Sequence, residues 1–311
     1  MLEVGVQNTG WFSWDDLDGS FARFKADGFE TVDLGFPGVA FDPEKPIESF
    51  YDQPLEDILA KYRPVKEAAD RYGITVSQSH APFPLWLKGE DTYNAYMIMV
   101  LEKLCAVCEA IGCPHMVAHP INRTLKENEW STNMELYRAI LPTAKRHGVK
   151  ICLENLFTVH TGRVLEGVCA DAEEACRYVD ALNAEAGAEV FGFCFDVGHA
   201  NLLHKDLRRY INTLGHRLSI LHIHDNDGQN DLHLMPYTQS RYRQVCTNAL
   251  DWESFILGLK DIGYRGTLCF ETFRVIRVTP KELWDSSLTH LSNIGRYFRD
   301  RILAPDGEAS E

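Results

Sequence analysis

Nine side chains that can bind a metal ion lie at or just beyond the ends of short apolar runs spread along the chain. These side chains are His80, His119, Glu154, Asp196, His199, His222, Asp231, His233 and Glu271. Runs of this kind are typical of buried strands, and six of them are residues 75–80, 115–119, 149–154, 190–196, 218–222 and 267–271. In a closed parallel barrel the carboxyl ends of all strands meet on one face, where side chains far apart in sequence come together. The pattern predicts one site assembled by a barrel.

The strongest metal candidates follow predicted strands five to eight. They are Glu154, Asp196, His222 and Glu271. Three carboxylates and one imidazole suit a divalent ion such as manganese, zinc, cobalt or magnesium. A single histidine at a strand end is more often a hydrogen-bonded structural residue, but buried carboxylates on several strands are costly without a cation. The sequence therefore predicts a divalent metal site.

A second tier of candidates surrounds this set: His80, His119, His199, His224, Asp231 and His233. Asp196 and His199 are three residues apart after one strand, so both can reach the same small volume. Asp231 and His233 are two residues apart, which in extended backbone points both side chains the same way. These groups could be additional metal ligands, or they could bind substrate hydroxyls and orient the first ligands.

Strand and helix patterns alternate from end to end, as in parallel βαβ units. Two more strands are expected at residues 2–7 and 31–35, which makes eight units. Helices are expected at residues 14–26 (with Ser13 as the N-cap), 55–72, 92–111, 134–147, 171–186, 205–214, 250–262 and 280–301. The fold class predicted is a single (β/α)8 TIM barrel over residues 1–303, followed by a flexible acidic tail at residues 304–311.

Composition narrows the class of protein. The 311 residues fit the size of an α/β barrel, and no segment has the roughly 18 consecutive apolar residues of a membrane span. Several of the nine cysteines lie in apolar runs, where a thiol acts as a small hydrophobe, and no export signal is visible, so a cytoplasmic location is expected. The net charge of −14 repels a phosphate backbone, which makes nucleic acid an unfavourable partner.

With these residues in view, the chain resembles the xylose isomerase-like barrel superfamily, which holds sugar and sugar-phosphate isomerases and epimerases together with endonuclease IV. The resemblance runs from about Val4 to Thr272, and its most specific stretches are 153–155, 195–201, 221–228, 231–233 and 270–272. It implies that Glu154, Asp196, one histidine of the His222/His224 pair and Glu271 hold one metal, often manganese. It also implies that the two glutamates exchange protons with substrate carbon.

The leading hypothesis is therefore a metal-dependent isomerase or epimerase of a small polyhydroxy carbonyl compound, a sugar or sugar phosphate. Manganese is the expected metal, with zinc, cobalt or magnesium as alternatives. The reaction would pass through a metal-stabilised enediolate, with Glu154 and Glu271 as base and acid and with His199 binding a substrate oxygen or moving protons. His222 is preferred over His224 as the ligand because Asp225 follows the pair as in the endonuclease-like version.

Two other activities stay open. The nine residues of the opening set also match the three-zinc ligand set of endonuclease IV, although the acidic charge and the segment at residues 81–87 do not suit DNA. A dehydratase or C-glycoside lyase would keep the same metal and begin with the same proton abstraction.

Contacts to substrate are predicted at Asn155, Trp11, Arg241 and Arg243. The two arginines lie within residues 235–252. This segment departs from the family pattern because it lacks the short glycine-rich turn of relatives. They could clamp a phosphate or carboxylate, but two solvated surface arginines are the preferred interpretation. Trp11, Trp14 and Trp86 are expected to be exposed near the mouth of the barrel, where they could line their own site or that of a neighbour in a homo-oligomer.

Overall fold

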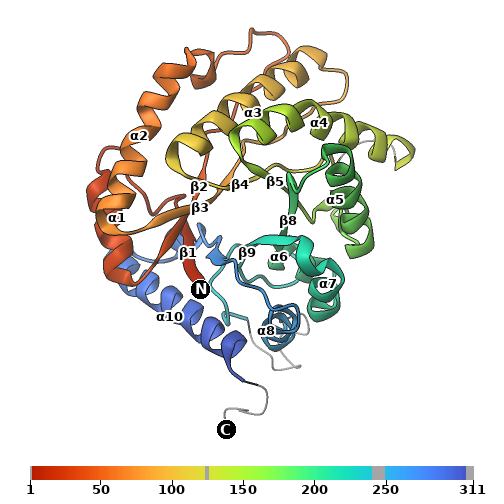
Figure 1. Ribbon diagram of the computed structural model, residues 1–311. Coiled ribbons are helices and arrows are strands. Elements are labelled where there is room, and N and C mark those ends of the chain that lie inside the picture. Colours follow the sequence, from red (N-terminus) through yellow and green to blue (C-terminus); the bar gives the residue numbers. More distant parts are fainter. Residues whose placement is uncertain (1, 123–125, 240–248, 306–311) are drawn as a thin grey trace.

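Eight parallel strands form a barrel in the described part of the computed structural model, which comprises residues 2–122, 126–239 and 249–305. The strands follow the order β10-β1-β2-β3-β4-β5-β8-β9 around the barrel (Figure 1). Their bounds are β1 (Glu3–Gln7), β2 (Thr31–Gly35), β3 (Thr75–His80), β4 (His115–Val117), β5 (Lys150–Glu154), β8 (Phe191–Asp196), β9 (Leu218–His222) and β10 (Thr267–Phe270). A bridge between Ile223 and Phe270 joins β9 to β10, so the predicted (β/α)8 TIM barrel is confirmed.

The helices surround the strands on the outside (Figure 1). They are α1 (Leu17–Asp27), α2 (Leu55–Tyr72), α3 (Asp91–Ile111), α4 (Lys126–His147), α5 (Ala172–Ala186), α6 (Val197–Leu202), α7 (Leu207–Leu214), α8 (Trp252–Asp261), α9 (Val275–Val278) and α10 (Trp284–Leu303). Short 3-10 turns occur at η1 (Phe50–Asp52), η2 (Gly215–Arg217) and η3 (Lys281–Leu283). No helix among these residues is long and apolar enough to cross a lipid bilayer.

The first predicted helix boundary is wrong. We expected the helix to begin at Trp14 with Ser13 as its cap, but α1 begins at Leu17, because the Asp16 side chain accepts a hydrogen bond from the Gly19 amide at 2.8 Å. A carboxylate at this position satisfies a free amide of the first helical turn. Ser13 instead donates its backbone N–H to Ser20 Oγ.

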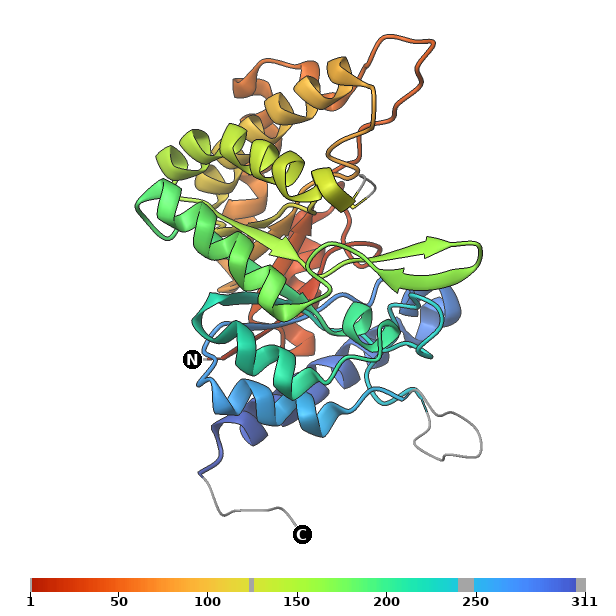
Figure 2. The same cartoon turned by 90° about the vertical axis from the view of Figure 1, so that its right-hand side faces the viewer.

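Two further features differ from the expectation. Helix α4 begins at Lys126 instead of Met134, and strands β6 (Phe157–His160) and β7 (Arg163–Glu166) form an antiparallel hairpin after β5. The hairpin projects away from the barrel (Figure 2). Thr161 and Gly162 both have positive φ at its turn, as a tight two-residue hairpin turn requires.

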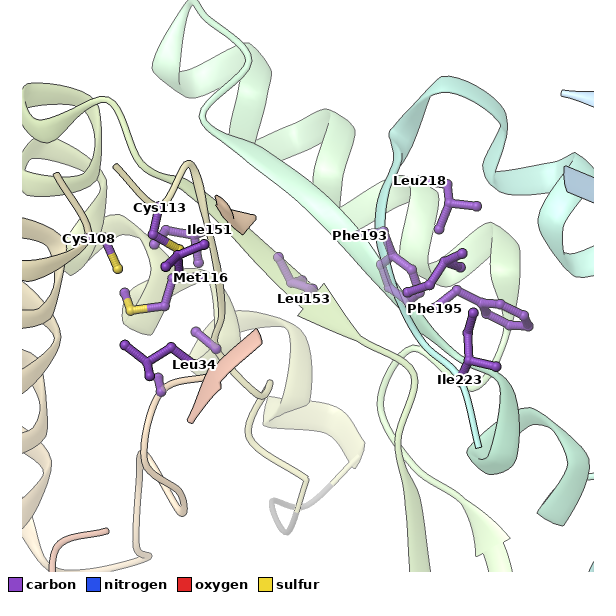
Figure 3. Packing of buried hydrophobic residues seen from close by; sticks show 14 of the residues in the cluster. Leu34, Cys108, Cys113, Met116, Ile151, Leu153, Phe193, Phe195, Leu218 and Ile223 are labelled. Atoms are coloured by element: carbon purple, nitrogen blue, oxygen red, sulfur yellow. The ribbon is translucent and has the colours of Figure 1, made fainter. Parts of the chain in front are cut away.

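Period-two alternation along the strands separates the core from the site. Outward side chains pack under the helices, where Cys108, Cys113 and Met116 lie together in Figure 3. Inward side chains form a separate apolar cluster of Val117, Cys152, Cys194 and Ile220. In β5, β8 and β9 the residue two positions after the clustered one is Glu154, Asp196 or His222, so these polar groups point inward above an apolar floor.

Candidate metal centre

Glu154 lies at the centre of the polar cluster, where it meets imidazoles from three other elements. Its Oε2 atom is 3.2 Å from His119 Nε2 and 3.3 Å from His222 Nδ1, and its Oε1 atom is 3.2 Å from His199 Nδ1. His80 joins this side of the cluster, with its Nε2 atom 3.0 Å from that of His119. Glu154 is only 1% exposed, so these contacts occur away from bulk water.

The other half of the cluster is built around Asp196, Asp231 and Glu271. His224 Nε2 lies 3.1 Å from Asp196 Oδ1, and His233 Nε2 lies 2.9 Å from Asp231 Oδ2. Glu271 Oε2 is 3.5 Å from His233 Nδ1 and also 3.5 Å from His222 Nδ1. The structure therefore brings all nine residues predicted from strand ends, together with His224, into one region at the carboxyl ends of the strands.

Three of the four predicted principal ligands lie close enough together to share an ion, and the fourth, Glu154, belongs to an overlapping group. Asp196, His222 and Glu271 each offer one ligand atom within 4.8 Å of the others, and His80, Glu154 and His222 form an overlapping group with the same spacing. Glu154 Oε2 and His222 Nδ1 are buried and lack a hydrogen-bond partner. Leaving such atoms unsatisfied is costly, and a divalent cation between them would remove that cost.

Three histidines of the second tier are oriented by backbone carbonyls. The Nδ1 atoms of His80, His199 and His233 lie 2.7, 2.9 and 3.0 Å from the carbonyl oxygens of Ala81, Asn155 and Glu271 respectively. A neutral imidazole held in this way carries its proton on Nδ1 and presents the Nε2 lone pair. Metal ligands are commonly held by such contacts, and so are histidines that bind substrate oxygen.

The two glutamates differ in their affinity for protons. Burial raises the pKa of the Glu271 carboxyl to about 7, an effect that outweighs the nearby His222 and His233 imidazoles. Burial would also raise the pKa of the Glu154 carboxyl, but the His119 and His222 imidazoles hold that pKa well below its usual range. Carboxyl groups with such different environments are suited to separate acid and base roles.

The strand-nine histidines face different partners. His222 Nδ1 points at Glu154 and Glu271, whereas His224 packs flat against His233, with ring centroids 4.0 Å apart. Gly198 makes room for His224, because a Cβ atom there would lie 1.9 Å from His224 Cε1. This placement favours His222 as the ligand of the principal set, and that assignment stays a prediction.

Some residues around the cluster were missed. Gln7 donates its side-chain amide to Glu271 Oε1 at 2.8 Å, and Gln78 donates to Asp33 Oδ2 at 3.1 Å. Asp33 Oδ2 in turn lies 3.3 Å from His222 Nε2. Asp33 is the one charged residue of β2, which is a signal that could have found it, whereas Gln78 lies among other polar residues of β3 and gives no such signal. Asn155 makes two hydrogen bonds of 2.8 Å to the Asp196 backbone, so it braces the exit of β8.

Of the three tryptophans expected to be exposed, Trp14 is exposed, Trp86 is half-buried and Trp11 is placed differently. Trp11 was expected to be exposed, but it is buried and packs edge-on against Trp284, since α10 returns to cover the first loop. Phe83 is exposed, and its ring is stacked on that of His119. Arg241 and Arg243 lie outside the described residues, as does the tail from residue 306 onward.

A family model described as "Xylose isomerase-like TIM barrel" matches residues 29–294, which is most of the chain. The chain therefore belongs to this family.

Curated relatives match over part of their length. The uncharacterized protein y4fM of Sinorhizobium fredii is 27% identical over 194 residues, which are 60% of this chain and 56% of that protein. An inosose isomerase of Bacillus velezensis is 24% identical over 181 residues, which are 57% of this chain and 60% of that enzyme. The chain thus spans less than two thirds of these relatives.

Solved structures match over nearly their whole length. A D-tagatose 3-epimerase-like protein has a TM-score of 0.69 and 18% identity, with coverage of 97% of this chain and 98% of the other. A D-psicose 3-epimerase has a TM-score of 0.68 and 15% identity, with coverage of 96% and 99%. At these identities the likeness shows the shared fold.

Proposed function

We propose that the protein is a divalent-metal-dependent isomerase or epimerase that acts on a small polyhydroxy carbonyl compound, a sugar or sugar phosphate. The observation that carries the proposal is the pair of buried glutamates, Glu154 and Glu271, whose Oε2 atoms lie 3.3 and 3.5 Å from the same nitrogen of His222. The names of the related isomerase and epimerases support the same class of reaction.

Glu154, Asp196, His222 and Glu271 would hold the ion, and manganese is the metal we expect. The orphaned Glu154 Oε2 and His222 Nδ1 atoms support this ligand set. When bound, a divalent ion polarises a substrate carbonyl and stabilises negative charge on its oxygen.

The chain's own residues would carry the proton transfer. One glutamate removes the proton from the carbon beside the carbonyl, and the other returns a proton, which inverts that carbon or moves the carbonyl. His199 would bind a substrate oxygen through Nε2, because its Nδ1 is directed at the Asn155 carbonyl. Burial of these groups excludes water, which strengthens each electrostatic contact with the substrate.

The test uses full-length protein stripped with a chelator and then restored with Mn²⁺. A panel of ketohexoses, keto-inositols and their phosphates is incubated with it, and products are identified by NMR. We expect one epimer or isomer to form with the restored protein, and none with the stripped protein or with Glu271→Gln. Glu253→Gln, on the outer helix α8, is the matched control that keeps activity. A metal-loaded protein that leaves every compound of the panel unchanged would argue against the proposal.

A phosphodiesterase with several zinc ions is the second candidate. The observation that favours it is the group of His199, Asp231 and His233, in which Asp231 Oδ2 lies 3.7 Å from His199 Nε2 and 2.9 Å from His233 Nε2. Cleavage of abasic-site DNA by protein that holds two or three zinc ions would establish it. A dehydratase or lyase on the same metal would instead be recognised by loss of water or of an aglycone in the NMR assay.

A further inference from the structure

Asp33 is a fully buried carboxylate inside the barrel that belongs to none of the predicted ligand sets. It lies on β2, two residues before Gly35, which pairs in register with His80. Asp33 is therefore one inward-facing layer below the metal cluster. Its Oδ2 atom is 3.3 Å from His222 Nε2, and its Oδ1 atom has no hydrogen-bond partner.

A carboxylate in this position is expensive unless a basic partner compensates it. Removing a charge from water costs several kcal/mol, and this cost is offset only by a well-placed opposite charge together with additional hydrogen bonds. Within the described part of the chain, His222 is the basic side chain that lies within ion-pair distance of Asp33. A role of the Asp33 carboxylate in orienting His222 would explain why the protein tolerates the cost of burying this charge.

The two nitrogens of His222 face carboxylates on opposite sides of the ring, and neither nitrogen has a hydrogen-bond partner. Nδ1 lies 3.3 Å from Glu154 Oε2 and 3.5 Å from Glu271 Oε2, on the cluster side. Nε2 faces Asp33 in the barrel interior. When Nδ1 gives its lone pair to a cation, the ring proton must reside on Nε2, and an acceptor is needed there.

Gln78 fixes Asp33 in place for this role. Its side-chain amide donates to Asp33 Oδ2 at 3.1 Å and to the carbonyl oxygen of Leu221 at 3.3 Å. Leu221 directly precedes His222, so the amide ties the carboxylate to the strand that carries the histidine.

We propose that Asp33 is a positioning residue that holds His222 with its Nε2–H directed into the barrel and its Nδ1 directed at the metal. The proposal rests on the proposed metal-dependent function, and it adds a residue that acts through a ligand without touching the ion. Partners of this kind orient the imidazole and raise its basicity, and their loss commonly weakens metal binding by about 10–100-fold.

The test measures the dissociation constant for Zn²⁺ and Mn²⁺ by competition with a chromogenic chelator. Asp33→Asn keeps the shape of the side chain and removes its charge, and we expect metal binding to weaken by about 10–100-fold. Asp27→Asn is the matched control, because Asp27 is also a buried carboxylate but lies at the end of the outer helix α1, where the Thr289 hydroxyl donates a hydrogen bond to its Oδ1 atom. The control should bind metal as the unmodified protein does.

A second pair of variants separates positioning from general stability. In a His222→Ala background, Asp33→Asn should cause no further loss of affinity. An equal loss with and without His222, or an unchanged affinity in Asp33→Asn itself, would overturn the proposal while leaving the metal-dependent function intact. Unmodified protein that binds no divalent metal would overturn both.

An NMR measurement on the unmodified protein covers the case in which Asp33→Asn does not fold. In zinc-loaded protein labelled with ¹⁵N-histidine, the ¹⁵N shifts of His222 should show Nδ1 bound to the metal and Nε2 protonated. A His222 bound to zinc through Nε2 would contradict the role given to Asp33.

Discussion

Gly198 offers a test of where the structure places His224. In Gly198→Ala the new Cβ atom would lie 1.9 Å from His224 Cε1 and 2.5 Å from each ring nitrogen. His224 has little freedom to move, because it is fully buried, its ring is stacked on that of His233, and its Nε2 is 3.1 Å from Asp196. Alanine in a helix gains about 1 kcal/mol over glycine, whereas overpacking a buried site costs about 1–3 kcal/mol.

The clash should therefore outweigh the gain in helix propensity, and the free energy of unfolding should fall by up to about 2 kcal/mol. With an unfolding entropy of about 2.1 cal/mol/K per residue, this loss lowers Tm by up to about 3 °C for the chain. Thermal and urea unfolding are followed by circular dichroism in chelator, so that the result does not depend on bound metal. Gly38→Ala is the matched control, because its new Cβ atom meets nothing within 4 Å. A Gly198→Ala protein at least as stable as both the unmodified protein and this control would refute the placement of His224.

Three further predictions concern the metal and the proton transfer. Elemental analysis of protein purified without chelators should find about one divalent ion per chain. Mn²⁺ at about 100 times its Kd should raise the free energy of unfolding by about 2.7 kcal/mol. A protein whose Tm does not change with any divalent metal would count against the site. Glu154→Gln and Glu271→Gln should each lower kcat by about 10²–10⁴-fold in the epimer assay, as expected for loss of an acid or base, and near-normal turnover in either would remove that residue from the mechanism. Gln7→Leu removes the amide that donates a hydrogen bond to Glu271 Oε1. Because a hydrogen bond to a charged group contributes about 1.5–3 kcal/mol, kcat should fall by roughly 10–100-fold with little change in KM. A change in KM alone would show that Gln7 acts on substrate binding.

The ligand cluster could be predicted because each member follows a strand. Once Glu154, Asp196 and Glu271 are recognised as strand ends, barrel geometry brings them together without knowledge of any side-chain conformation. The buried cysteines followed from the same reasoning, since Cys152 and Cys194 occupy inward positions two residues before Glu154 and Asp196.

The supporting residues could not be predicted in the same way. Gln7, Asp33 and Gln78 act across the barrel, and their partners are set by strand register and rotamer, which no local pattern encodes. The burial of Trp11 depends on Trp284 of α10, which is far away in sequence. The start of α1 depends on whether Ser13 or Asp16 caps the helix, and such boundaries vary by a few residues.

The most direct test of the proposed reaction is proton exchange with solvent. Manganese-restored protein is incubated in D₂O with the ketose or keto-inositol that the panel identifies, and deuterium at each carbon is measured by NMR. We predict incorporation at the carbon beside the carbonyl, dependent on the metal and lost in both Glu154→Gln and Glu271→Gln. Metal-loaded protein that exchanges no carbon-bound proton in any sugar, yet cleaves a phosphodiester, would contradict the assignment of these two glutamates as the proton-transfer pair.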